Sequence, residues 1–598
     1  MTKLILGIFA VLVTFLPVHS QSDSPDLLKL ARLHGVAFFV LEDKVIEDEI
    51  IEKIRLLDGS GQDPEFNLLI ERMIPDAPKP NYSLIDTAGL LLNAKPYQLI
   101  NDSVFTAKNR DRLQFAILGK SGKVKGDQKD LRVIEYPNNP ELAEIDSTDV
   151  IRSFLRLWSS INYYYPYKDE LPQHWDSVFL DYLPIFLKAS RAENRAKQYN
   201  MGLHKLSAEI NDSHVRLSEV FDKRAHNQAH RQAKKDKKAA RKTAKQSPDT
   251  TEKKWMLFPV RFKAIDSCLY IAKLFPCAET EGLEIGDQVE SINDWSVPQM
   301  QARYDELYAN SNSVRRNFEM NRRNSWKSFT KRDTMRLKLK EVEADPKIMP
   351  KVEVTLSEYN SYLAPQQIKS PENEAGLVYL KISDDDKGEF KSKLKKSAKE
   401  DLPLIIDARD YPSGLFITLI PKYLSKKSQA TASFYSSSTR YPGVYAYTST
   451  YHMFFSNTAD MLFKMLRIYP THWQPFIPLV KTIDAPVVVL IDEATMSWGE
   501  TTVMSIAAHK KENLTLIGRN TAGANGNIGL VQLAGQKELS FTRVIINDQC
   551  DQNYQRQGIP PDVYVAPSIP TPDHQDQDLI LQTALDFLRE QEKQAVME

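Results

Sequence analysis

A serine at the junction of a predicted strand and a predicted helix is the residue of this chain best suited to chemistry. Residues 486–491 form an apolar, β-branched run that predicts a strand buried on both faces, and residues 501–508 predict a helix. Ser497 lies between them, where backbone N–H groups are unpaired and the helix dipole is positive. Such a turn can expose a nucleophilic hydroxyl. The spacing of Ser497 and Glu500 also fits a capping box, in which the serine is only a structural cap.

The elements that would position this serine form an α/β pattern. Strands are predicted over residues 376–382, 404–409 and 514–518, with helical or mixed segments between them. This pattern indicates a mostly parallel sheet, in which chemistry lies beyond the carboxyl ends of the strands, where Ser497 falls. A nucleophilic serine also needs preorganised donors for the oxyanion. The backbone N–H of Trp498 is the first candidate donor, and its large side chain is expected to shape a substrate pocket.

Length and composition describe an ordinary multidomain globular protein. The chain has 598 residues, which predicts three or four domains, and 78 basic against 78 acidic residues. Overall charge therefore favours neither nucleic acid nor a membrane as partner. Only three cysteines are present, so this is no disulfide scaffold, although pairing of Cys268 with Cys277 across a hairpin stays open. No Cys and His spacing fits a zinc site, and we expect neither a metal nor a cofactor.

The amino terminus predicts export. Residues 1–20 have a basic start, a short apolar core and a small residue at the exit, as in a secretory signal peptide; a membrane anchor is the less favoured alternative. No other run is long and apolar enough to cross a membrane, so no integral membrane segment is expected after its removal. The bacterial periplasm or the extracellular space is the expected location. Residues 21–145 predict an accessory α+β domain without recognisable chemistry.

The remaining chain divides by pattern into five parts. Residues 146–221 predict a helical subdomain, whose aromatic cluster 163–167 is interpreted as core. Residues 222–254 are basic and poor in large apolar side chains, which predicts an exposed insertion and no nucleic-acid site. The other parts are a β-rich unit at 255–345, the α/β unit at 346–570 and a C-terminal helix at 571–598.

The β-rich unit resembles a PDZ domain. Residues 286–294 read Gly-Asp-Gln-Val-Glu-Ser-Ile-Asn-Asp, which nearly reproduces the turn and strand of that family. The resemblance implies that an extended polypeptide, or its carboxyl terminus, could be held as an added strand at a sheet edge. The alternative is that the groove is filled and the unit is structural.

Five features in one order resemble the secreted serine peptidases of the C-terminal-processing and tricorn type. They are Ser213-His214, the PDZ-like unit, the turn 407–414, the Ser497-x-x-Glu500 turn and the loop 520–527. The resemblance implies a catalytic fold related to ClpP and crotonase, with a helical subdomain and a PDZ-like unit beside it. The overall fold class is therefore expected to be multidomain α/β and α+β.

The resemblance also implies which residues act. One branch of the family uses a lysine where this chain has Ala524, so that base is missing. The tricorn-like branch uses a histidine preceded by serine, and Ser213-His214 matches it. Histidine titrates near neutrality and can take the serine proton. The third member of that branch is a glutamate, which corresponds here to Gln555, a neutral group that could orient His214 but would stabilise its charged form less.

The family places a second oxyanion donor in the turn after a neighbouring strand, which makes Tyr411 or Gly414 the candidate. The predicted substrate-binding residues are Trp498, Tyr411, Thr521 and Gly523. We therefore predict a secreted serine peptidase that cleaves polypeptide through an acyl-enzyme on Ser497. Two alternatives stay open. One is a catalytically silent peptide-binding scaffold on the same fold, and the other is a non-peptidase acyl hydrolase, because the same nucleophile serves any acyl transfer.

Overall fold

The computed structural model describes most of the chain from residue 138 onward. The described ranges are 138–220, 254–363 and 376–597, without 324, 330–332, 341–344, 384–385, 413–418, 426–429, 439–440, 453–480, 510–512 and 573–576. Residues 31, 34, 48, 50–52, 54, 133, 134 and 136 are described as well. The predicted signal peptide, nearly all of the accessory domain and residues 222–253 of the basic insertion lie outside these ranges.

A five-stranded parallel sheet carries the predicted nucleophile. Its strands lie in the order β11 (Val378–Lys381), β12 (Leu404–Asp407), β15 (Val487–Ile491), β16 (Leu514–Gly518) and β20 (Val563–Tyr564). Every neighbouring pair is parallel, and the register sets Leu404 against Val487 and Val487 against Leu514. The predictions of strands at 486–491, 404–409 and 514–518 and of a helix at 501–508 are confirmed.

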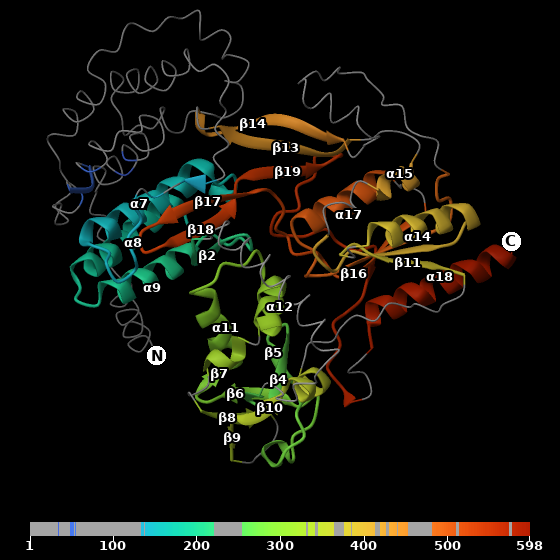
Figure 1. Cartoon of the computed structure of the whole chain (residues 1–598), viewed down its shortest axis with the longest axis horizontal. Helices are drawn as coiled ribbons and strands as arrows, with labels where there is room; N and C mark the ends of the chain where they lie inside the picture. Colours follow the sequence, from blue (N-terminus) through green and yellow to red (C-terminus); the bar gives the residue numbers. More distant parts are fainter. Residues whose placement is uncertain are drawn as a thin grey trace, which may run out of the picture.

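Both faces of this sheet are covered, which explains its continuous apolar strands. Val487, Val489 and Ile491 of β15 belong to one core with α14 (Lys387–Glu400), α15 (Ile420–Leu424) and α17 (Trp498–His509). Val488 and Leu490 point to the opposite face, where they pack on α18 (Leu579–Met597). Figure 1 shows α18 as the red helix on the side of the sheet away from α14 and α17.

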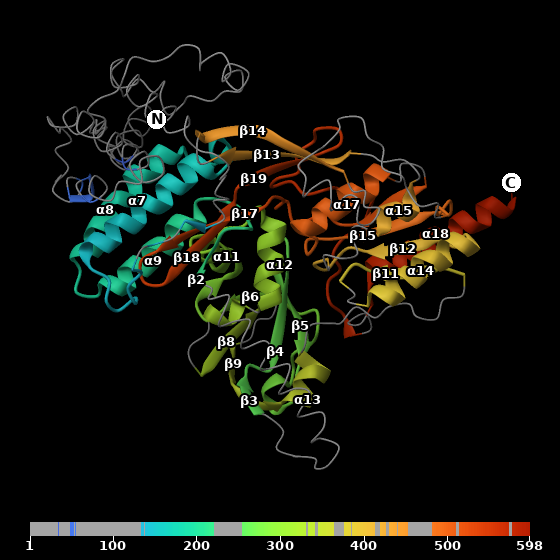
Figure 2. The same ribbon diagram turned by 45° about the horizontal axis from the view of Figure 1, so that its top comes forward.

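A second layer system brings segments far apart in sequence together. The helices α7 (Ser147–Tyr164), α8 (Trp175–Arg191) and α9 (Arg195–Ala208), with the short η3 (Lys168–Glu170), pack against a sheet of order β1, β17, β18, β2. These strands are β1 (Val133–Ile134), β17 (Ile528–Leu533), β18 (Lys537–Thr542) and β2 (Arg216–Glu219). The tyrosines at 163–165 and 167 are buried in the shared core, as predicted. Figure 2 shows the cyan helices against the red strands β17 and β18.

The third unit, which we call the β-domain, has its own core. Its sheet has the order β4 (Val260–Ile265), β5 (Cys268–Leu274), β6 (Gln288–Ile292), β8 (Thr334–Leu339) and β9 (Lys347–Pro350), with β7 (Trp295–Ser296) on β6. Strands β3 (Lys254–Leu257) and β10 (Val352–Thr355) pair separately. The helical elements are η4 (Ala278–Thr280), α11 (Val297–Asp305), α12 (Ser313–Arg323), η5 (Ser325–Phe329), α13 (Leu356–Glu358) and η6 (Tyr359–Leu363). In both views α12 points from this green domain toward the other two units.

An antiparallel ribbon completes the described fold. Strand β13 (Ala430–Ser438) lies between β14 (Tyr441–His452) and β19 (Val544–Asp548), above the junction of the helical and α/β units in Figure 1. The described elements thus form a mixed α/β structure.

The three cysteines are free. Cys268 opens β5, and Cys277 follows that strand's last residue, Leu274, by three positions. An extended strand rises about 3.3 Å per residue, so the length of β5 places the two sulfurs much farther apart than a disulfide spans. The pairing that the sequence left open is therefore not formed.

Candidate active site

Ser497 occupies the turn between β15 and α17 with its backbone in the left-handed region, at φ +56°. A non-glycine residue held there costs on the order of 1–3 kcal/mol, and such strain clusters at functional sites. The Ser497 N–H donates to the carbonyl oxygen of Ala524 at 2.9 Å and to Oε2 of Glu500 at 3.2 Å. Among the residues that the structure describes, the Ser497 hydroxyl has no hydrogen bond. Only the glutamate half of the predicted capping box forms, so the hydroxyl is not used as a cap.

Glu500 fastens the loop after β16 to this turn. Its side chain is completely buried, and Oε1 accepts from Thr521 Oγ1 at 2.6 Å and from the Gly523 N–H at 2.9 Å. Oε2 accepts from the Ala524 N–H at 3.1 Å as well as from Ser497. Burial raises the pKa of Glu500 to about 7, although the four hydrogen bonds act in the opposite direction. One carboxylate thus fixes the position of the serine backbone relative to residues 521–524.

Two predicted substrate-binding residues have structural roles in the same loop. Thr521 Oγ1 accepts from the Ile559 N–H at 2.7 Å while it donates to Glu500. Gly523 has φ +65°, and a Cβ at this position would lie 2.7 Å from the carbonyl carbon of Arg556. Both residues are therefore needed for the loop's conformation, and their contact with substrate stays a prediction.

His214 lies in the turn that joins α9 to β2. Its Nδ1 is 2.9 Å from Thr542 Oγ1, and its backbone N–H donates to Asp212 Oδ1 at 2.8 Å. The carbonyl oxygen accepts from Ser540 Oγ at 2.6 Å. Strand β18, which pairs with β2 directly after this turn, supplies both hydroxyl groups. Burial lowers the pKa of His214 and so favours the neutral imidazole, which is the form that can accept a proton.

The loop 524–526 connects the surroundings of His214 with those of Ser497. On one side, the Ala524 carbonyl holds the Ser497 backbone. On the other side, Gly526 packs so closely on Thr542 that a Cβ on the glycine would lie 2.7 Å from Thr542 Cγ2. Since Thr542 in turn contacts the His214 ring, the predicted nucleophile and the predicted base flank one three-residue segment.

Gln555, the predicted third member, is buried beside the same loop. Its Oε1 accepts from the Asn525 N–H at 3.1 Å, and its Nε2 is buried without a hydrogen bond within the described part of the chain. No hydrogen bond joins Gln555 to His214 among the described residues, so its role as orienting group stays a prediction. Sequence reasoning missed Thr542, which does contact the ring. Nothing in the isolated pattern of β18 marks that threonine; only the pairing of β18 with β2 does.

Ser213 and the start of α12 tie the β-domain to the site. Ser213 and Ser311 exchange two hydrogen bonds, each backbone N–H donating to the other hydroxyl at 3.0 Å and 2.9 Å. Asn312 Nδ2 donates to the carbonyl oxygens of Ala522 and Arg556 at 3.3 Å and 3.0 Å. The predicted Ser213 hydroxyl is thus an acceptor for the β-domain.

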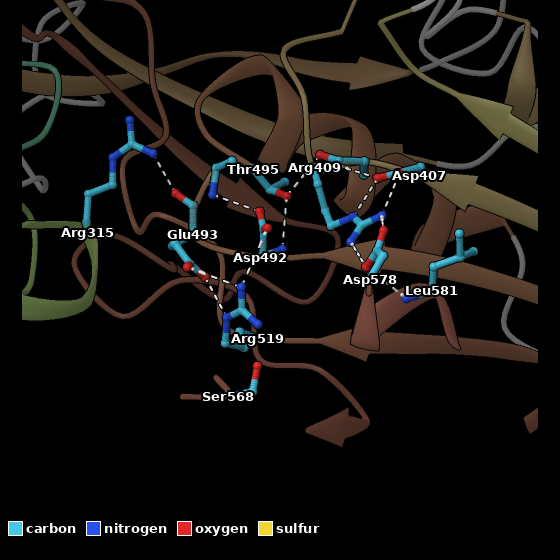
Figure 3. A network of polar contacts seen from close by, with 12 residues as sticks. Arg315, Asp407, Arg409, Asp492, Glu493, Thr495, Arg519, Ser568, Asp578 and Leu581 are labelled. Carbon is cyan, nitrogen blue, oxygen red and sulfur yellow. Dashed lines mark hydrogen bonds and ion pairs between the residues drawn. The ribbon is translucent and has the colours of Figure 1, made fainter. Parts of the chain in front are cut away.

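Arg315 contacts the segment just before the nucleophile. Its guanidinium donates to the Glu493 carbonyl oxygen and lies 3.3 Å from Met496 Sδ, and it pairs with Glu319 at 2.6 Å. Figure 3 shows the Arg315 side chain pointing at Glu493. Through Arg315, the β-domain therefore contacts and stabilises the turn that carries Ser497.

The turn after β12 lies beside the start of α17. Thr495 Oγ1 donates to the Ala408 carbonyl oxygen at 2.9 Å, and a Cβ on Gly499 would lie 3.8 Å from Pro412 Cδ. Tyr411, the predicted donor and substrate contact, is 64% exposed next to this proline. Gly414, the alternative donor, lies outside the described residues. Trp498 opens α17.

Charged pairs hold the carboxyl ends of the strands in place. Figure 3 shows Arg409 between the carboxylates of Asp407 and Asp578, which it contacts at 2.6–2.9 Å. Arg519 pairs with Glu493 at 2.8 Å. Burial raises the pKa of Asp492 to about 7, and the charge of neighbouring Glu493 adds to this effect. These pairs fix α18 and the 492–495 turn to the sheet.

The described residues contain no group of three or more His, Cys, Asp or Glu arranged to hold a metal ion. Of the helices that the structure describes, none has the length and apolar character needed to cross a bilayer.

A strained serine at a strand-to-helix turn, on a parallel sheet, is the arrangement of a serine-type hydrolase. Residues 375–565 match the model of Peptidase family S41, and this range contains β11 to β20 with Ser497. Residues 375–565 are thus similar to an S41 peptidase domain, and the chain is a serine-type peptidase.

Several solved structures are similar to the chain over most of its length, at low identity. Mature CPAF complexed with lactacystin aligns with 13% identity and a TM-score of 0.45, covering 75% of this chain and 98% of that one. The photosystem II D1 C-terminal processing protease aligns with 14% identity and a TM-score of 0.32, covering 72% and 97%. The tricorn protease aligns with 13% identity and a TM-score of 0.31, covering 74% of this chain and 37% of that one. No curated protein matches significantly.

Proposed function

We propose that this chain is an exported, tricorn-like serine peptidase in which Ser497 forms the acyl-enzyme and His214 is the general base. The observation that supports this most directly is the unpaired hydroxyl of Ser497, held in a strained turn by Glu500, with His214 on the other side of the loop 524–526. A neutral, buried imidazole suits proton abstraction near neutral pH.

The reaction would run in two acyl-transfer steps. His214 Nε2 takes the Ser497 Oγ proton as Oγ bonds to the scissile carbonyl carbon, and it then returns the proton to the leaving amine as the C–N bond breaks. Water repeats the sequence and releases the acid. Because Nδ1 contacts Thr542 Oγ1, a proton on Nδ1 can be donated to that oxygen, which leaves the Nε2 lone pair for Ser497.

The oxyanion would be stabilised at the N-terminus of α17. The Trp498 N–H is our first donor, supported by its place in the first turn and by the helix dipole. Tyr411 or Gly414 would supply the second donor from the turn after β12, which packs beside Gly499 through Pro412. Loss of one such donor typically costs about 2.7–4 kcal/mol of transition-state stabilisation.

Cleavage of casein and of unstructured peptides by the purified chain tests this function. Ser497→Ala should abolish turnover, and His214→Ala should lower it by about 10²-fold or more. Ser505→Ala is the matched control, because Ser505 is a buried serine of the same helix whose hydroxyl has no partner among the described residues. Equal rates for the wild type and Ser497→Ala would reject the assignment.

For the β-domain we propose a PDZ-like fold that holds substrate polypeptide by its carboxyl terminus along β4. Strand β4 is an edge of its sheet, as strand addition requires. The Ala264 N–H and C=O on this edge are bonded to the Asn321 side chain of α12 at 2.7 Å and 3.1 Å. An incoming strand has to displace Asn321, so Asn321→Ala should strengthen binding of a fluorescent substrate peptide. Unchanged binding would reject the β4 edge as the peptide site.

A catalytically silent scaffold is the second candidate, and the buried neutral Gln555 favours it. It predicts peptide binding without turnover, unchanged in Ser497→Ala. A third candidate, a non-peptidase acyl hydrolase, predicts cleavage of small esters without cleavage of peptides. We also propose removal of residues 1–20 on export; the mature amino terminus would then be Gln21, which N-terminal sequencing measures directly.

A further inference from the structure

Asp212 is a buried carboxylate next to the predicted base. Its side chain is fully buried, and Oδ1 accepts from the His214 N–H at 2.8 Å while lying 3.9 Å from His214 Nδ1. Oδ2 is buried and has no hydrogen bond in the part of the chain that the structure describes. One carboxylate oxygen therefore holds the backbone of His214, and the other makes no hydrogen bond with any described residue.

Asp212 supplies the negative charge that acts on His214, and the other nearby charges are positive. Burial lowers the pKa of His214, the Asp212 charge opposes this, and the guanidinium groups of Arg315 on α12 and Arg216 on β2 lower it further. The residue of β18 that contacts the His214 ring is the neutral Thr542. The Asp212 charge also contributes to the raised pKa of Tyr165, where burial is the larger cause, so its field reaches that ring as well.

Gln555 cannot provide the same help. It is neutral, and its Oε1 already accepts from the Asn525 N–H at 3.1 Å. Its hydrogen bond stabilises the loop 524–526, on which the position of Ser497 depends.

We propose that Asp212 and Thr542 together take the role of the third triad member. Thr542 orients the His214 ring, and Asp212 stabilises the protonated form of that ring. This inference rests on the proposed role of His214. During acylation the Ser497 proton moves to Nε2 as the Oγ–C bond forms and the π bond of the carbonyl gives its electron pair to the oxygen. The Nδ1–H group stays hydrogen-bonded to Thr542 Oγ1. Both are positioning residues, because each acts through its contact with His214.

Asp212→Asn separates charge from structure. The amide keeps an oxygen that accepts from the His214 N–H but removes the negative charge. The imidazole pKa of His214, followed by NMR titration in the Ser497→Ala background, should fall in Asp212→Asn. An unchanged pKa would overturn the proposal, and a purely structural role would lower Tm without moving this titration. Asp181→Asn, an exposed change on α8 of the same unit, is the control.

Turnover by the full-length enzyme provides the second readout. Asp212→Asn should reduce kcat/KM at neutral pH about tenfold or more and move the acid limb of the profile to lower pH. Thr542→Val should lose a similar factor, whereas Thr542→Ser, which keeps the hydroxyl, should retain activity. Equal activity of Thr542→Val and Thr542→Ser would overturn the orienting role. If Ser497→Ala itself remains active, the proposed function fails, and the NMR titration still decides the effect of Asp212.

Discussion

Glu500→Gln is the substitution that most sharply separates stability from activity in this site. Glu500 is a fully buried carboxylate that accepts hydrogen bonds from Ser497, Thr521, Gly523 and Ala524. The glutamine has nearly the same shape, but it is neutral and has one acceptor oxygen in place of two. We expect it to stabilise the fold at alkaline pH relative to the wild type and to weaken catalysis.

The magnitude follows from the pKa. Burial raises the pKa of Glu500 from 4.5 to about 7. A carboxyl whose folded pKa is raised contributes stability that is present below its unfolded pKa and is lost as pH rises through the folded value. At 1.36 kcal/mol per pKa unit, this loss is about 3 kcal/mol between pH 4.5 and pH 8. Glutamine does not titrate, so the stability difference should move by this amount in favour of Glu500→Gln over that range.

Urea unfolding of both proteins at pH 5 and pH 8 measures this difference, and kcat/KM at pH 8 measures the catalytic cost. The Ser497 and Ala524 N–H groups share one carboxylate oxygen, so an NH₂ group there would release the turn, and kcat/KM should fall about 10-fold or more. A stability difference that is the same at both pH values would refute the reasoning. So would unchanged kcat/KM in a variant that loses two acceptor contacts.

Three further predictions concern the same region. Burial lowers the pKa of His214 below its ordinary 6.5, so the acid limb of kcat/KM should lie below about pH 6.5; a limb above pH 7 would contradict this. Burial raises the pKa of Asp492 from 3.8 to about 7, so the wild type should lose stability as the pH rises from about 4 to 7. Asp492→Asn should reduce that loss. If urea unfolding at pH 5 and pH 8 shows the same loss of stability in both proteins, this prediction is wrong. Arg409→Met leaves the Asp407 and Asp578 carboxylates without their partner, and unfolding should become easier by about 3–5 kcal/mol, whereas the exposed Asp410→Asn should change little.

The sequence predicted the strand-to-helix turn because its signal is local. Five consecutive apolar residues, four of them β-branched, favour a short strand covered on both faces, and the helix signal follows within a few positions. Parallel strands then bring their carboxyl ends to one edge, so the turns of β12, β15 and β16 were expected together.

The parts that the sequence did not reveal depend on pairing between distant segments. Thr542 contacts His214 only because β18 pairs with β2, more than 300 residues earlier in the chain. Arg315 reaches Met496 because α12 of the β-domain packs against the catalytic turn. Glu500 looked like a local cap, and its contacts with residues 521–524 required the register of β15 and β16. None of these has a signature in a single segment.

The most direct test of the central claim is active-site labelling with a fluorophosphonate, which phosphonylates an activated serine, followed by peptide mass mapping. We predict one adduct, on Ser497, whose rate of formation falls strongly in His214→Ala and is unchanged in Ser505→Ala. Labelling of another serine, or equal labelling rates in the wild type and His214→Ala, would contradict a Ser497 nucleophile activated by His214.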